Sequence, residues 1–255
     1  MADLPEWHNI RYTRCRIPKL TDVIPSPLGC HSERSRGILK PLNTPKYGHP
    51  ITEDDFNQSL QIYAALKQII AKYRLDGLTL RCFDLLTALG NTGCLSLSLL
   101  NAEGFIATCE GDIPAMLTMA ISRALTGVSG FQANPSRIDV EKGEMLFAHC
   151  TIPLDMIDDY DLDTHFESGI GIGVRGRMRP GDVTVFKVSG DLTRVFAEEG
   201  VLVRNQAEPD LCRTQQVIRL DNPVKARYFL TCPIGNHHVI LPGRWKSQIE
   251  ELLGA

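Results

Sequence analysis

The segment FIATCEGDIPAMLTMAISRAL, residues 105–125, decides the fold class. Phe105–Cys109 is a short apolar run that predicts a strand, and Asp112 with Pro114 provides the cap and the first turn of a following helix. The charged Glu110 falls between the two elements, just before a glycine turn. A strand that runs directly into a helix is typical of α/β structure with a parallel sheet.

The residues before this segment repeat the same pattern. Thr52 and the acidic residues after it predict a helix start, and apolar residues on one face predict an amphipathic helix over 53–74. Leu78–Phe83 predicts a strand, and Cys94–Leu100 predicts the crossover helix that joins it to the next strand. Residues 52–125 are therefore predicted to form a truncated α/β layer.

The two flanking regions differ from this layer. Residues 1–51 contain seven prolines and no sustained apolar period, which predicts a Pro-rich arm with little regular structure. Residues 126–255 show short, closely spaced strands and a final helix over Arg244–Leu253, which predicts a mainly antiparallel, β-barrel-like domain. The fold class is therefore α/β plus all-β. The strands predicted there are Met145–Cys150, Val183–Val188, Gln216–Leu220, Arg227–Cys232 and His238–Leu241.

The composition excludes several classes of function. The chain has 255 residues, 43% of them hydrophobic, and a net charge of −3, which is typical of a globular protein with an ordinary core. It has no Lys/Arg run interleaved with aromatics, no signal-peptide profile and no apolar stretch near the roughly 20 residues of a membrane span. We expect a cytoplasmic protein with a small-molecule ligand, and no nucleic-acid or membrane partner. The eight cysteines, without a CxxC pair, predict reduced, buried, structural thiols.

Ionisable side chains lie at the ends of the predicted strands. Asp84 and Glu110 each follow an apolar strand, and His149 lies near the end of another. Ligand sites in open α/β sheets lie beyond the carboxyl ends of the strands. His237 and His238 add two imidazoles between a turn and a strand. Two carboxylates and two imidazoles form a plausible site for Mn²⁺, Mg²⁺ or Zn²⁺.

Each of these residues has a simpler interpretation. Asp84 taken alone is more often a helix N-cap, whereas Glu110 beside a buried strand needs a partner for its charge. A single histidine such as His149 is usually a hydrogen-bonded core residue. Neighbouring residues of a strand point to opposite faces, so at most one of His237 and His238 faces a given site.

A second polar cluster follows in the β region. His165 and Glu167 are predicted to share one face of a strand, where they form either a proton-handling pair or a surface ion pair. Arg213 lies in a polar segment and either binds a substrate oxygen or makes structural hydrogen bonds. The glycine-rich run at 169–174 lacks the spacing of a dinucleotide-binding loop and predicts a bent strand.

Six short segments, in this order, resemble the signature segments of the L-fucose isomerase-like proteins, the group of L-fucose and L-arabinose isomerases. The resemblance covers about residues 52–245, and its specificity comes from the joint occurrence of motifs that are weak singly. The segments are RCFDLL at 81–86, CEGD at 109–112, AHCT at 148–151, THFESG at 164–169, CRTQ at 212–215 and GNHH at 235–238.

The resemblance implies a divalent metal, usually Mn²⁺, held by acidic residues and histidines. Matched by segment order, the ligands are Asp84, Glu110, His149 and one of His237 and His238. In this family the two acidic residues also act as acid and base, while an open-chain aldose is converted to a ketose through a cis-enediol. The side chains expected to contact the sugar are those of Arg81, His165, Glu167, Arg213 and Asn236.

The resemblance also bears on partners. Full-length members of the family carry an N-terminal nucleotide-fold-like domain that helps to close the site of a neighbouring subunit, whereas this chain starts with the Pro-rich arm. We therefore expect a homo-oligomer or a separately encoded N-terminal chain to complete the site, with metal binding but poor sugar turnover by the lone chain. The alternative is a metal- or sugar-binding protein that no longer turns over substrate.

Overall fold

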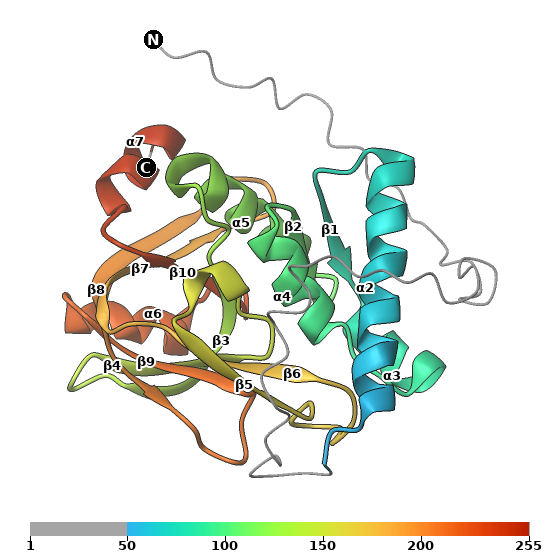
Figure 1. The fold of residues 1–255 in the computed structure, drawn as a ribbon. Coiled ribbons are helices and arrows are strands. Elements are labelled where there is room, and N and C mark those ends of the chain that lie inside the picture. The colour runs from blue at the N-terminus through green and yellow to red at the C-terminus, as the bar shows by residue number, and fades with distance from the viewer. Residues whose placement is uncertain (1–49, 255) are drawn as a thin grey trace.

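The structure is a computed structural model that describes residues 50–254 (Figure 1). The predicted Pro-rich arm, residues 1–51, lies almost wholly outside the described residues. A layer of helices with two parallel strands stands beside a closed six-stranded barrel. The predicted fold class is confirmed, and the division at residue 126 into two domains stays a prediction.

The α/β layer is built on two parallel strands, β1 (Gly77–Leu80) and β2 (Ile106–Cys109), whose ends coincide because Leu80 pairs with Cys109. Helix α2 begins with a capping box in which Thr52 and Asp55 bond each other's backbone N–H. Asp112 caps the helix after β2 by accepting from the Ala115 N–H at 2.7 Å. The helices of the layer are α2 (Glu53–Tyr73), α3 (Cys82–Leu89), α4 (Cys94–Ala102) and α5 (Ile113–Thr126).

The end of the first strand differs from the prediction. The strand expected to reach Phe83 stops at Leu80, and α3 begins at Cys82. Within α3 the buried residues are Cys82 and Leu85, a spacing typical of one helical face. The mostly apolar run Leu78–Phe83 does not reveal this spacing, because it ends before Leu85. Asp84 therefore lies in the first turn of a helix and does not directly follow a strand.

The barrel closes in the order β10-β3-β4-β9-β8-β7, with every neighbouring pair antiparallel. A separate hairpin of β5 and β6 leads away from β4 toward the α/β layer (Figure 1). The strand bounds are β3 (Phe131–Asp139), β4 (Glu144–His149), β5 (Asp159–Asp163), β6 (Gly173–Arg177), β7 (Gly181–Val188), β8 (Val195–Gln206), β9 (Thr214–Leu220) and β10 (His238–Pro242). The short helical pieces are η2 (Leu154–Met156), η3 (Pro223–Arg227), α6 (Tyr228–Thr231) and α7 (Lys246–Leu253).

One predicted strand is wrong. The segment Arg227–Cys232 is helical, because Asn222 caps the Val224 N–H and Pro223 stands in the first helical position. Its aromatic residue Phe229 packs into the barrel core and so explains the apolar run. Among residues 50–254, no helix combines the length and the apolar character that a membrane span requires.

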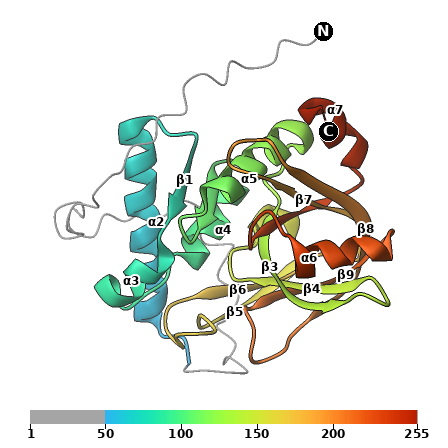
Figure 2. The same ribbon diagram turned by 180° about the vertical axis from the view of Figure 1, so that it is seen from behind.

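Helix α5 lies between the parallel strands and the barrel, where it packs against β2 on one side and against β7 and β10 on the other (Figures 1 and 2). Because strand side chains alternate, each barrel strand sends one face inward and the other toward the helices. On β10, Ile240 belongs to the barrel core, whereas Val239 and Leu241 pack in the cluster that contains α5. This alternation decides where the two histidines at the start of β10 point.

Candidate active site

The site begins where the second parallel strand ends. Glu110 directly follows β2 and adopts a left-handed backbone conformation with φ of 63°, and Gly111 continues it with φ of 68°. A glutamate tolerates this conformation only at an energetic cost, and such residues cluster at functional sites. The turn is fixed by the Gly111 N–H, which donates to the Leu80 carbonyl at 3.1 Å, and the Glu110 side chain reaches His149 and His237 of the barrel region.

Two buried histidines of the barrel meet the Glu110 carboxylate. His149 Nε2 lies 3.3 Å from Oε1, and His237 Nε2 lies 3.4 Å from Oε2. The adjacent imidazoles, His149 first and then His237, hold the pKa of Glu110 well below its usual range, against the opposing effect of burial. The carboxylate is therefore ionised at neutral pH.

The two imidazoles are positioned from behind. His149 is the last residue of β4, and its Nδ1 lies 3.0 Å from the Thr151 hydroxyl. His237 Nδ1 lies 2.8 Å from Asp112 Oδ2, at the start of α5. Both Nε2 atoms are buried and form no aligned hydrogen bond with the described residues, despite their proximity to Glu110. The two Nε2 atoms and the Glu110 carboxylate thus face one another, and neither nitrogen has an aligned hydrogen-bond partner among the described residues.

A buried lysine supports this arrangement. Lys187, only 1% exposed, reaches from the end of β7 and places Nζ 3.6 Å from Asp112 Oδ1. Burial raises the pKa of Asp112, but the hydrogen bond with His237 and the charge of Lys187 outweigh it, so the pKa is lowered. Burial likewise lowers the pKa of His237, but Asp112 and Glu110 outweigh it and raise the pKa. Burial lowers the pKa of Lys187.

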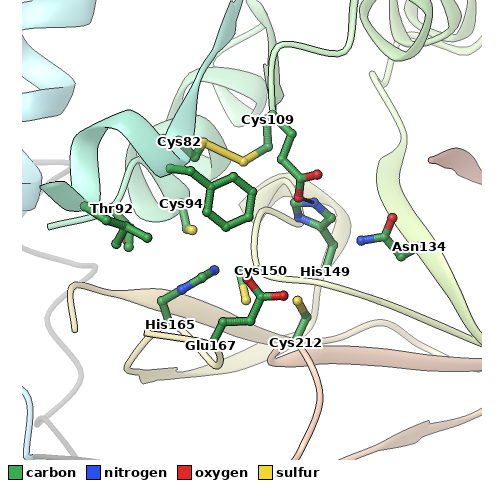
Figure 3. A pocket seen from close by; sticks show the side chains of 13 residues that line it. Cys82, Thr92, Cys94, Cys109, Asn134, His149, Cys150, His165, Glu167 and Cys212 are labelled. Carbon is green, nitrogen blue, oxygen red and sulfur yellow. Dashed lines mark ion pairs between the residues drawn. A yellow bond between two sulfur atoms is a disulfide. The ribbon is translucent and has the colours of Figure 1, made fainter. Parts of the chain in front are cut away.

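The Glu110 carboxylate opens onto a cavity between the α/β layer and the barrel (Figure 3). His165 and Glu167 line the cavity from the loop between β5 and β6, and Phe83 and Leu86 are its apolar lining residues. Thr92 and Asn134 add neutral hydrogen-bonding groups. Five cysteines complete the lining among the described residues: Cys82, Cys94, Cys109, Cys150 and Cys212.

The donor set can be tested against a metal ion. Ligand atoms of Cys109, Glu110 and His149 lie within 4.8 Å of one another. Cys109 is bonded to Cys82 in a disulfide, so its sulfur is not a thiolate ligand in this state. His237 Nε2 offers a further donor 3.4 Å from the other oxygen of the Glu110 carboxylate, but His237 is not part of the group within 4.8 Å. One carboxylate and two imidazoles are ligands that suit Mn²⁺, Fe²⁺ or Zn²⁺, so the chemistry of these donors fits such an ion.

Of the residues predicted as ligands, the structure brings Glu110, His149 and His237 together and leaves two apart. The side chain of Asp84 is 59% exposed and pairs with Arg81 at 3.1 Å on the surface of α3. It is not among the residues that line the cavity: the first strand ends four residues before Asp84, and helix α3 carries the carboxylate outward.

His238 lies on the other face of β10. Its Nε2 lies 3.0 Å from the Tyr228 hydroxyl, and its ring packs against Phe229 inside the barrel. Burial lowers the pKa of His238 to about 3, so the ring is neutral. The open choice between the two histidines therefore falls on His237 as the one that faces Glu110.

The residues predicted to contact substrate also divide. His165 and Glu167 line the cavity, but from a turn and not from a strand face as expected. Arg213 is 3% exposed and donates to the Thr164 carbonyl at 2.7 Å, which is structural bonding. Asn236 reaches the cavity only indirectly, since it donates to the Asn134 side chain at 2.6 Å. The surface pair leaves Arg81 78% exposed.

Sequence reasoning missed two kinds of residue. It did not single out Asp112 beyond its role as a helix cap, or Lys187, although a lysine between Phe186 and Val188 in an apolar strand signals a buried charge. It was also wrong about one cysteine pair: Cys82 and Cys109, with Cα atoms 6.1 Å apart, form a disulfide. The parallel pairing that aligns the ends of β1 and β2 brings them together, which no local pattern reveals.

No protein-family model matches the chain. Residues of this chain align with the sulfoquinovose isomerases of Priestia megaterium, at 30% identity, and of Clostridium sp. strain MSTE9, at 27% identity, each over 135 residues. The chain is similar to sugar isomerases. The alignment covers 51% of this chain and 30% of each relative, so the chain spans less than a third of the length of the relatives it matches.

Proposed function

We propose that the cavity is the site of a metal-dependent aldose–ketose isomerase, of the kind found in the L-fucose isomerase-like group. The observation that carries this proposal is the meeting of Glu110 with two buried imidazole nitrogens that have no aligned hydrogen bond in the described structure. The similarity to sulfoquinovose isomerases supports the same chemistry. Glu110, His149 and His237 would hold Mn²⁺ or another divalent ion. When bound, the ion supplies electrophilic stabilisation to adjacent oxygens of the sugar.

The protein's own groups then perform three tasks. Glu110, whose pKa is held low, stays ionised and acts as a ligand and not as a proton store. Asp112 and Thr151 orient the two imidazoles through their Nδ1 atoms, which fixes Nε2 toward the cavity. Thr92 and Asn134 offer hydrogen bonds to neutral sugar hydroxyls.

The proton transfer needs a second group across the cavity. Aldose–ketose conversion through a cis-enediol moves one proton between neighbouring carbons on one face of the open-chain sugar. Glu167 also lines the cavity, and in this proposal it moves the proton between the two carbons. His165, which lines the cavity as well, carries protons to and from the sugar oxygens. This assignment replaces Asp84, whose side chain is on the outer surface of α3.

The substrate is proposed to be an open-chain aldose. Among the described residues that line the cavity there is no Lys or Arg. Neutral aldoses and sulfoquinovose, whose sulfonate is anionic, are therefore the two arms of a substrate panel. Completion of the site by a second copy or by a separate N-terminal chain remains part of the proposal.

The test is a ketose assay with Mn²⁺ on the wild type, Glu167→Gln and the exposed control Glu141→Gln, paired with a metal-binding titration of each. We expect Glu167→Gln to bind Mn²⁺ like the wild type and to lose turnover by about 10²–10⁴-fold, the usual contribution of an acid/base group. Metal binding without turnover by the wild type on every sugar would favour the alternative of a non-catalytic binding protein. Equal turnover by the wild type and Glu167→Gln would contradict the assigned proton carrier.

A further inference from the structure

Three free thiols, those of Cys94, Cys150 and Cys212, lie in a row along the cavity (Figure 3). The Cys150 sulfur occupies the middle, with Cys212 on one side and Cys94 on the other. Neither the candidate metal ligands nor the proposed proton carriers require this row. Three nucleophilic sulfurs in contact are chemically distinct from scattered structural cysteines.

The middle sulfur is fixed in place. Cys150 is 1% exposed, and its Sγ accepts the Arg213 backbone N–H at 3.4 Å. Gly173 packs so closely that a Cβ there would lie 3.4 Å from the same sulfur. The Arg213 guanidinium is in turn bonded to the Thr164 carbonyl at 2.7 Å. Cys150 therefore sits in a rigid frame beside Cys212, the residue just before the arginine.

The two outer thiols differ in access. Cys94 is 2% exposed and opens α4, a helix whose residues are mostly buried, so it has little room to move. Cys212 is partly exposed and lies in the connection between β8 and β9, outside regular structure. Both Cys150 and Cys212 line the cavity that a small oxidant would enter, and Cys212 has the freedom to adopt disulfide geometry with the fixed Cys150.

We propose that Cys150 and Cys212 are a reversible dithiol–disulfide pair that is oxidised by hydrogen peroxide. One sulfur of the pair attacks a peroxide oxygen, the O–O bond breaks, and water leaves, which converts that thiol to a sulfenic acid. The other sulfur then attacks the sulfenic sulfur and expels the hydroxyl as a second water, which forms the S–S bond. In total two thiols and one peroxide give one disulfide and two waters, and an added dithiol restores both thiols.

The sequence allows a clean assay of this pairing. Trypsin releases Cys150 alone in residues 143–175 and Cys212 alone in 205–213, whereas residues 82–123 carry Cys82, Cys94 and Cys109 together. The full chain is treated with a slight excess of hydrogen peroxide, its remaining thiols are blocked with N-ethylmaleimide, and the digest is analysed by mass spectrometry. We expect the two short peptides to be joined, with the loss of two hydrogens, and to separate after dithiothreitol.

Matched variants fix the interpretation. Cys94→Ser and Cys232→Ser should leave the joined peptide in place, and Cys212→Ser should abolish it without disturbing the buried frame. A Cys212 peptide that becomes linked to residues 82–123, that stays fully blocked by N-ethylmaleimide, or that ends as an irreversible sulfinic acid would overturn the proposal. The readout is chemical and needs no sugar turnover, so failure of the isomerase assay and failure of this pairing are separate results.

Discussion

His237 and His238 are adjacent in the sequence, but one faces the cavity and the other the barrel interior, and their pKa values shift in opposite directions. At the mouth, burial lowers the pKa of His237, yet Asp112 and Glu110 outweigh burial and raise it. In the interior, burial lowers the pKa of His238 to about 3, and the ring meets the Tyr228 hydroxyl. Both acidic partners of His237 come from the α/β layer. The candidate site therefore lies at the junction of the α/β layer and the barrel, since neither part alone supplies both the carboxylates and the imidazoles.

The largest expected effect follows from removing the charge at the junction. Mn²⁺ at about 100 times its Kd stabilises the folded protein by about 2.7 kcal/mol. At roughly 2–4 °C per kcal/mol, this raises the melting temperature by about 5–10 °C. Glu110→Gln keeps the size of the side chain but removes the charge, and it should abolish the Mn²⁺-dependent shift. A thermal-shift titration measures it, with the exposed Glu141→Gln as the control. A full shift in Glu110→Gln would show that Glu110 is not a ligand.

The next comparison separates the two histidines directly. His237→Gln should lose most of the Mn²⁺ response, because it removes a donor nitrogen that faces Glu110. His238→Gln should keep the Mn²⁺ response and lower the unfolding free energy by about 1–3 kcal/mol, because it disturbs a buried hydrogen bond. Metal titration and urea unfolding of both variants check the pair. The reverse pattern would place the ligand inside the barrel.

A smaller effect on metal affinity is expected from Asp112, which contacts His237 but is not a proposed metal ligand. Asp112→Asn retains a residue able to cap α5 but removes the negative charge that orients His237. Loss of such a supporting carboxylate usually costs about 10–100-fold in metal affinity. Isothermal titration with Mn²⁺ measures the change, and circular dichroism confirms that the helix is intact. An unchanged affinity would make Asp112 a cap and nothing more.

The smallest effect concerns the pH dependence of stability. The folded pKa of His238, about 3, lies below the ordinary value of 6.5, so the unfolded chain binds more protons between these pH values. Its contribution is present above pH 6.5 and is lost as pH falls toward 3, with a slope of at most about 1.4 kcal/mol per pH unit. Urea unfolding of metal-free protein across this range should show a flatter profile for His238→Gln. Parallel profiles for wild type and variant would contradict the neutral buried ring.

The elements that the sequence predicted best have local signals. The helix over 53–74 was indicated by Thr52 and the acidic residues after it, and it ends within one residue of the predicted bound. The helix after Asp112 was indicated by its cap and proline, and it begins at Ile113 as they predict. Strand alternation also indicated that the neighbouring histidines would face opposite sides. These features depend only on residues close together in the chain.

Most of the wrong or missing predictions share one cause: they depend on contacts between residues that are distant in the sequence. A six-residue apolar run ending at Phe83 fits a strand or a helix, and packing of Leu85 against the layer decides for the helix. The Arg227–Cys232 run is an exception, because the Asn222 cap and Pro223 just before it are local signals of a helix. Lys187 meets Asp112 across 75 positions of sequence, and the pairing of Cys82 with Cys109 depends on the register of the parallel strands.

The central claim is that Glu110, His149 and His237 bind one divalent ion at the junction. The most direct measurement is anomalous diffraction from crystals of the protein soaked with Mn²⁺, recorded near the manganese edge. The account predicts one strong peak within roughly 2.0–2.6 Å of a carboxylate oxygen and of the two Nε2 atoms. A peak beside Asp84 on the surface of α3, or no peak at Mn²⁺ concentrations that shift the melting temperature, would contradict it.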